Sequence, residues 1–245
     1  MSGFTVLEES DGVSYRMMAE TDAPYVIPAV SKAFDEGEPT TKTGGSTSAD
    51  MTAFCTMFIP RMHEMSVLAT DSRDGSIVGA FLCQDYSNPD PEEEYAGFMA
   101  GLEGDWMPCL TAISECEEAF NTSFGVPPES KPAGKWFQLW NVGVDPAWRG
   151  RGIGKKLTEL AVKVAKDKGY EVAFGICSDA ISTKIMTAHN GATADHFVPY
   201  ESWEGCETAE CLRSLPAQGH AGMSLCVIRL WGESKRSARS SPGGD

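Results

Sequence analysis

The most constraining feature of the sequence is a glycine-rich loop that lies between an apolar segment and an amphipathic one. Residues 136–144 form an apolar run typical of a buried strand, and residues 152–168 carry apolar side chains at helical spacing. The connection, residues 145–154, reads Asp-Pro-Ala-Trp-Arg-Gly-Arg-Gly-Ile-Gly. Glycine adopts backbone conformations that other residues avoid, so a sharp turn here leaves N–H groups unpaired at the start of a helix.

Those unpaired N–H groups and the helix dipole together favour an anion at this point. Arg149, Arg151 and Lys155 add positive charge around it. A dinucleotide fingerprint needs a third glycine at a fixed spacing after the first strand, and a P-loop needs Gly-Lys-Ser/Thr; neither pattern is present. The loop therefore predicts a diphosphate site, with a plain glycine-rich turn as the alternative.

Periodicity along the chain predicts strands at 13–19, 66–71, 77–85, 136–144, 171–177 and 222–231. It predicts helices at 23–34, 49–65 (interrupted at Pro60), around 107–120, 152–168 and 178–189. This order indicates one α/β domain with a mixed central sheet. We expect the domain to span residues 1–232, with an acidic insertion at about 87–131 and a disordered tail at 233–245.

The distribution of charge is uneven. The formal net charge of −15 argues against nucleic acid as a partner, because a phosphate backbone would be repelled. Ten acidic residues and no lysine or arginine lie between Asp85 and Glu118, whereas seven basic residues lie between Arg149 and Lys168. One end of the molecule is thus suited to a cation and the other to a phosphorylated anion; a merely solvated acidic face is the alternative.

No apolar run is long enough to span a bilayer, and the amino terminus lacks the features of a signal peptide. We therefore expect a cytoplasmic protein without a membrane partner. The eight cysteines include no Cys-x-x-Cys pair, which predicts reduced thiols rather than a disulfide framework or a metal site.

The glycine loop carries a family resemblance. Arg149-x-x-Gly152-x-Gly154, preceded by Val144-Asp-Pro146, resembles the acetyl-CoA signature (Gln/Arg-x-x-Gly-x-Gly/Ala) of the GNAT superfamily of N-acetyltransferases, and the match extends over about residues 136–192. The resemblance implies the GNAT acyl-CoA N-acyltransferase fold, in which helices flank a central mixed β-sheet. It also implies acetyl-CoA as cosubstrate, a primary amine as acceptor, and no metal.

The resemblance implies a set of coenzyme contacts. The strand before the loop should splay from its parallel neighbour and offer backbone groups to the pantetheine arm, with the Val142 N–H holding the thioester oxygen. The expected coenzyme-binding residues are Val142, Gly143, Val144, Arg149, Gly150, Arg151, Gly152, Ile153, Gly154, Lys155 and Ser178.

On the acceptor side, the segment from Phe34 to Pro39 resembles the Glu-Pro segment of the insect arylalkylamine (dopamine) N-acetyltransferase branch. The resemblance implies that Glu38 is a general base acting through water; an acidic turn that caps a helix end is the alternative. The same branch has two serines four residues apart, which correspond to Ser178 and Ser182.

We expect Ser178 to cap a helix, and Ser182 to contact the coenzyme or reprotonate its thiolate. Many superfamily members use a tyrosine for that last step, but Met186 stands at the corresponding position, and Tyr200 is a distant substitute. The aromatic side chains of Tyr95, Phe98 and Trp106 either line an amine pocket or only pack in the core.

The leading hypothesis is acetyl transfer to a small cationic amine, an arylalkylamine or a polyamine, by direct attack on the thioester. The first alternative is an acetyltransferase for protein N-termini or lysines. The second is a GNAT-fold module that binds acyl-CoA without turnover. We expect a monomer or a homodimer.

Overall fold

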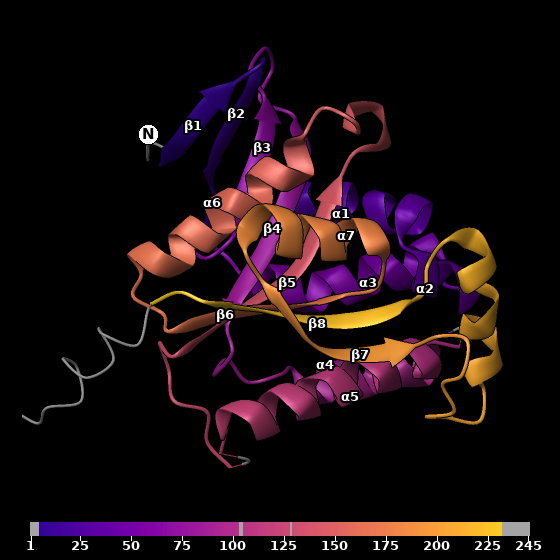
Figure 1. Ribbon diagram of the computed structural model, residues 1–245. Coiled ribbons are helices and arrows are strands. Elements are labelled where there is room, and N and C mark those ends of the chain that lie inside the picture. The colour runs from indigo at the N-terminus through magenta and orange to yellow at the C-terminus, as the bar shows by residue number, and fades with distance from the viewer. Residues whose placement is uncertain (1–4, 103–104, 128, 232–245) are drawn as a thin grey trace, which may run out of the picture.

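The computed structural model describes residues 5–102, 105–127 and 129–231 (Figure 1). Its strands are β1 (Val6–Ser10), β2 (Val13–Met17), β3 (Val67–Asp71), β4 (Ile77–Asp85), β5 (Trp136–Val144), β6 (Val172–Cys177), β7 (Thr193–Pro199) and β8 (Gly222–Arg229). Its helices are α1 (Ala23–Gly37), α2 (Pro39–Thr43), α3 (Ser48–Phe58), α4 (Glu92–Gly101), α5 (Met107–Phe124), α6 (Ile153–Asp167) and α7 (Ala180–Lys184).

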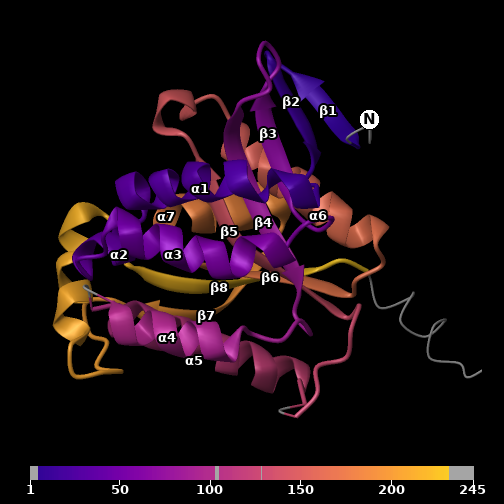
Figure 2. The same cartoon turned by 180° about the vertical axis from the view of Figure 1, so that it is seen from behind.

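The strands form one mixed sheet in the order β1-β2-β3-β4-β5-β6-β8-β7. All neighbours are antiparallel except β5 and β6, which are parallel. Helices α6 and α7 cover one face of the sheet, and α1 and α3 cover the other, as the two opposite views show (Figures 1 and 2). The expected α/β fold with a mixed central sheet is therefore confirmed.

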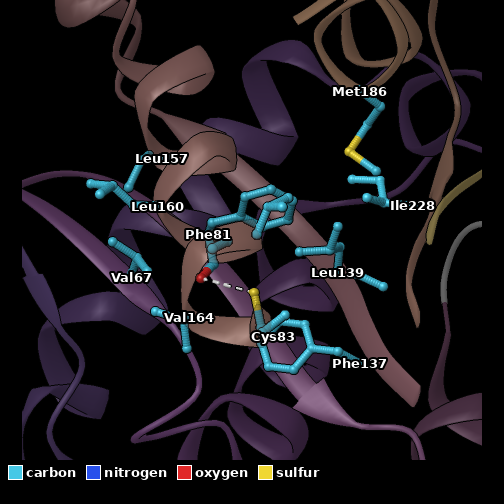
Figure 3. Close-up of a cluster of buried hydrophobic side chains, with 14 of the residues drawn as sticks. Val67, Phe81, Cys83, Phe137, Leu139, Leu157, Leu160, Val164, Met186 and Ile228 are labelled. Atoms are coloured by element: carbon cyan, nitrogen blue, oxygen red, sulfur yellow. Dashed lines mark hydrogen bonds between the residues drawn. The ribbon is translucent and has the colours of Figure 1, made fainter. Parts of the chain in front are cut away.

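Strand β4 is buried on both faces, which explains its continuous apolar run. Phe81 and Cys83 pack in the cluster that contains Leu157 of α6 (Figure 3). Ala80 and Leu82 point the other way, into the cluster formed with α1 and α3. Strand β5, which leads into the glycine loop, pairs with β4 and is thus held against a strand that is packed on both faces.

The predicted order missed two strands. β1 forms a hairpin with β2 through Asp11 and Gly12, which both have positive φ. β7 lies at the opposite edge of the sheet and pairs only with β8. Both are edge strands with polar, partly exposed side chains, so neither shows a clear apolar run.

Two helix predictions need correction. The helix expected over 49–65 ends at Phe58, where a 3₁₀ turn that contains Pro60 follows. The helix expected over 178–189 begins at Ala180 and continues as a π-helical turn from Ile185 to His189.

The acidic segment 87–131 contains two helices, α4 and α5, rather than one. Helix α5 buries Ala112, Cys116 and Phe120 against β7 and β8, so this segment completes the core.

All eight cysteines are unpaired, as expected, and five of them are buried. Within the described ranges no helix has the length and apolarity to cross a bilayer. The tail expected over 233–245 lies outside the described residues.

Candidate active site

The glycine loop leaves a group of backbone donors free at the start of α6. Gly150 and Gly152 both have left-handed φ angles, +77° and +78°, which favour glycine. Gly152 caps α6 without a side chain, and the helical hydrogen bonds begin with the Lys156 N–H, which donates to the Gly152 carbonyl at 3.0 Å. No described residue accepts a hydrogen bond from the N–H groups of 150–155. The loop is therefore built to receive an anion.

The basic side chains around the loop differ in what they contact. Arg149 donates to the carbonyls of Val144 and Ala33, both at 3.1 Å, and so ties the loop to the end of α1. Arg151 donates to the Asp11 carbonyl at 3.0 Å. Lys155 is exposed and forms no ion pair with any described residue. Arg149 and Arg151 thus shape the loop, whereas the Lys155 charge is available to a ligand.

Strands β5 and β6 diverge as the resemblance implied. They pair only over Trp136–Gln138 and Val172–Phe174. The Asp145 N–H donates to the Val78 carbonyl at 2.9 Å, which fixes the alternation of hydrogen bonds between β5 and β4. The backbone groups of Gly143 therefore face β4, whereas those of Val142 and Val144 face the gap.

A cavity of about 410 Å³ extends from this gap toward α5. It brings together eight of the thirteen expected coenzyme-binding and catalytic residues: Glu38, Val142, Gly143, Val144, Arg149, Gly154, Ser178 and Ser182. Gly150, Arg151, Gly152, Ile153 and Lys155 do not line it; they belong to the loop and the first turn of α6. The two ends of the glycine loop, Arg149 and Gly154, and the expected base Glu38 thus line one continuous space.

Glu38 is held at the N-terminus of α2. Its Oε2 atom accepts from the Thr41 N–H at 2.6 Å and from the Thr40 hydroxyl at 2.8 Å. Its Oε1 atom is buried and has no hydrogen-bond partner. Glu38 therefore does cap a helix, the following one, and the cap leaves one carboxylate oxygen without a hydrogen-bond partner. Burial raises the pKa of the neighbouring Cys109 thiol to about 12, which keeps that thiol protonated.

The expectation that Ser178 caps the helix is wrong. Asp179 is the cap: its Oδ1 atom accepts from the N–H groups of Ile181 at 2.6 Å and Ser182 at 2.7 Å. Ser178 precedes the cap, so the two serines do not share a helix face, although both line the cavity. The Ser182 hydroxyl donates to the Asp179 carbonyl at 3.1 Å.

Neither Met186, which stands at the position of the family tyrosine, nor Tyr200 places a hydroxyl in the cavity. Met186 is buried and lines the cavity without a hydroxyl. Tyr200 is fully buried, does not line the cavity, and donates to the Ser178 carbonyl at 2.9 Å. Burial raises the pKa of Tyr200 far above its usual range, so its hydroxyl positions Ser178 and stays protonated.

The far part of the cavity has aromatic walls. Phe54 lies between Trp140, with ring centroids 5.4 Å apart, and Trp106, at 5.3 Å. Of the three aromatic residues considered in the sequence, Trp106 lines the cavity, whereas Tyr95 and Phe98 pack behind it.

Sequence reasoning missed Phe54, Trp140 and one face of α5 that carries Cys109, Ile113 and Glu117. The spacing of four residues in α5 was the available signal, because such residues share a helix face.

The comparisons with known proteins fit this geometry. A sequence model of the acetyltransferase (GNAT) family matches residues 42–180. This is more than half of the 245 residues, so the protein belongs to the GNAT acetyltransferase family, and the expectation of an N-acetyltransferase is confirmed. The match includes the glycine loop but not Glu38. No curated protein sequence matches the chain significantly.

Several solved structures share the fold. The C-terminal condensation domain of Ebony, in complex with beta-alanyl-dopamine, has a TM-score of 0.72 at 10% identity and covers 88% of this chain and 98% of its own. Arylalkylamine N-acetyltransferase 2 from Aedes aegypti has a TM-score of 0.69 at 19% identity, with 90% and 100% covered. The Drosophila melanogaster polyamine N-acetyltransferase, which forms N-acetylagmatine, has a TM-score of 0.64 at 21% identity, with 89% and 99% covered. The fold is therefore the GNAT fold, and it is shared with the insect branch that the Glu38-Pro39 segment resembles.

Proposed function

We propose that this protein transfers the acetyl group of acetyl-CoA to the primary amine of a small cationic molecule. The observation that carries the proposal is the position of the Glu38 carboxylate. Glu38 lines the same cavity as Val142, the residue at the gap between β5 and β6, and its buried Oε1 atom has no hydrogen-bond partner. This arrangement supports a general base and a thioester site within one small space.

The donor half of the cavity suits the coenzyme. The free N–H groups of residues 150–155 and the Lys155 charge would hold the diphosphate. The backbone groups of Val142 and the Val144 N–H would pair with the pantetheine arm, since the Val144 carbonyl already accepts from Arg149. The Val142 N–H would stabilise the thioester oxygen as it gains charge. A preorganised donor of this kind contributes roughly 3 kcal/mol. The absence of a side chain at Gly143 lets α1 pack closely against β5, because a Cβ there would lie 3.0 Å from the Ala33 Cβ.

The acceptor half suits an ammonium ion. An amine of pKa about 10 must lose a proton before it can attack, which at pH 7 costs roughly 4 kcal/mol. We assign that proton to Glu38, directly or through one water. The free amine then attacks the thioester carbon, the carbon–sulfur bond breaks, and the coenzyme leaves as a thiolate that takes up a proton. Ser182 lines the donor side and is the hydroxyl we assign to the sulfur, once it turns from the Asp179 carbonyl.

The size and lining of the cavity favour a small acceptor over a protein. Phe54, Trp106 and Trp140 close its far part, so an alkyl or aromatic stem fits where an extended peptide would need an open groove. An arylalkylamine and a polyamine are the acceptors of two enzymes that share the fold.

The test is a thiol-release assay with acetyl-CoA and a panel of acceptors: tyramine, serotonin, spermidine, and peptides with a free N-terminus or a lysine. Turnover of the small amines supports the proposal. Turnover of the peptides alone makes this a protein acetyltransferase, and acetyl-CoA binding without thiol release for any acceptor makes it a binding module. Either result overturns the proposal.

A further inference from the structure

A second carboxylate lines the cavity. Glu117 projects from α5, and its Oε1 atom accepts from the Gln138 amide at 3.1 Å. Gln138 accepts in turn from Gln84 at 2.7 Å, so a buried chain of amides fixes the position of the carboxylate. No described residue donates to Oε2, and this atom keeps some contact with solvent. The cavity therefore contains a fixed carboxylate with one oxygen available.

The charge of Glu117 is poorly compensated within the protein. Burial is the largest influence on this carboxyl and raises its pKa. Lys131 acts in the opposite direction, but its ammonium lies over the ring of Tyr86, 3.6 Å from the centroid, and forms no salt bridge with Glu117 in the described part of the chain. Asp90 adds further negative charge. Because a buried carboxylate is costly without a partner, this position favours a cation from the ligand.

Helix α5 and strand β5 give similar estimates of how far Glu117 lies from Glu38 and Val142. Cys109 lies near Glu38, since the Thr40 hydroxyl contacts the Cys109 sulfur at 3.0 Å and Glu38 at 2.8 Å. Glu117 follows Cys109 by eight residues of α5, which corresponds to roughly 12 Å along the helix axis. On β5, Gln138 and Val142 are four residues apart, or roughly 13 Å along the strand. The two carboxylates thus line one cavity and stand roughly 12 Å apart.

We propose that Glu117 binds a second cationic group of the acceptor, so that the enzyme prefers dications to monoamines. This inference rests on the proposed function. If the two carboxylates are roughly 12 Å apart, a hydrogen bond of about 3 Å at each one leaves about 6 Å between the two nitrogen atoms of the acceptor. A chain of about four methylene groups spans that distance at bond lengths near 1.5 Å. Phe54 and Trp140, which line the same cavity as both carboxylates, would pack against the alkyl stem.

The experiment compares 1,4-diaminobutane and agmatine with n-butylamine and n-pentylamine in the thiol-release assay. We expect kcat/KM at least tenfold higher for the dications. Glu117→Gln should bring the ratio of dication to monoamine close to one, mainly through the KM of the dication, while the KM of acetyl-CoA stays the same. Glu118→Gln is the matched control, because it removes the same charge from an exposed neighbour on α5 and should leave the ratio unchanged.

A second variant guards against a purely structural effect on the Gln84–Gln138 chain. Glu117→Asp moves the carboxylate back by one methylene group, so the preferred diamine should become one carbon longer, 1,5-diaminopentane. Equal losses for dications and monoamines in both variants, or no preference for dications in the wild type, overturn the inference and leave the proposed function intact. Failure of the wild type to acetylate any small amine overturns both.

Discussion

Glu38 caps a helix and faces the cavity, and substitution by glutamine separates these two roles. The amide oxygen of Glu38→Gln can still accept from the Thr41 N–H, now 2.6 Å away, so the cap loses only its charge. Replacing a capping side chain altogether costs about 1 kcal/mol, which sets an upper bound on the loss of stability. A general base contributes about 10²–10⁴ to the rate. We therefore expect kcat/KM to fall at least a hundredfold at pH 7, with the urea midpoint almost unchanged.

The pH profile is the decisive measurement. Without the base, only the small neutral fraction of the amine reacts, so log kcat/KM of the variant should rise with unit slope up to the pKa of the amine, about 10. Glu36→Gln is the matched control, because it removes an exposed charge two residues away. A loss smaller than threefold together with a profile like that of the wild type would refute the assignment of Glu38 as the base.

Three further predictions concern the donor site and the fold. Gly152→Glu places a carboxylate in the anion loop at a φ of +78°, so acetyl-CoA affinity measured by calorimetry should fall at least a hundredfold, whereas Gly97→Glu on α4 should leave it unchanged. Gly143→Val forces a side chain against Ala33 and should lower the free energy of unfolding by about 1–3 kcal/mol in urea titrations. Burial alone would raise the pKa of Asp85, but the N–H groups of Ser87 and Gly134 hold it below its ordinary value. Its contribution to stability is therefore present above about pH 4 and lost as the pH falls, so Asp85→Asn should flatten the acid side of the stability curve.

The glycine loop and the strand and helix on either side of it could be predicted from the sequence because their signals are local. The apolar runs at 77–85 and 136–144 gave strand bounds identical to those of β4 and β5. The glycines of the loop mark the turn, and the apolar spacing of the next segment marks α6. Each of these patterns needs only neighbours along the chain to be interpreted.

The rest of the cavity lining depends on contacts between distant segments. Glu38 was found only through a short resemblance, and Glu117, Phe54 and Trp140 meet through the packing of α3, α5 and β5, which no local pattern specifies. The error at Ser178 has a different cause. Serine and aspartate are both favourable caps, and the sequence places them side by side. The end of β6 at Cys177 and the extended backbone of Asp179 decide between them.

The divergence of β5 from β6 couples ligand binding to the integrity of the sheet. Beyond Gln138 the two strands no longer share hydrogen bonds, so the backbone groups of β5 that face β6 have no partner on that strand. A ligand that pairs with β5 there takes the place of a strand and binds only the folded chain. Binding therefore raises the free energy of unfolding, by about 2.7 kcal/mol when the free ligand concentration is a hundred times its dissociation constant. Thermal unfolding of this protein would then report occupancy by such a ligand, because the ligand would fill the gap between β5 and β6 in the sheet that the described residues form.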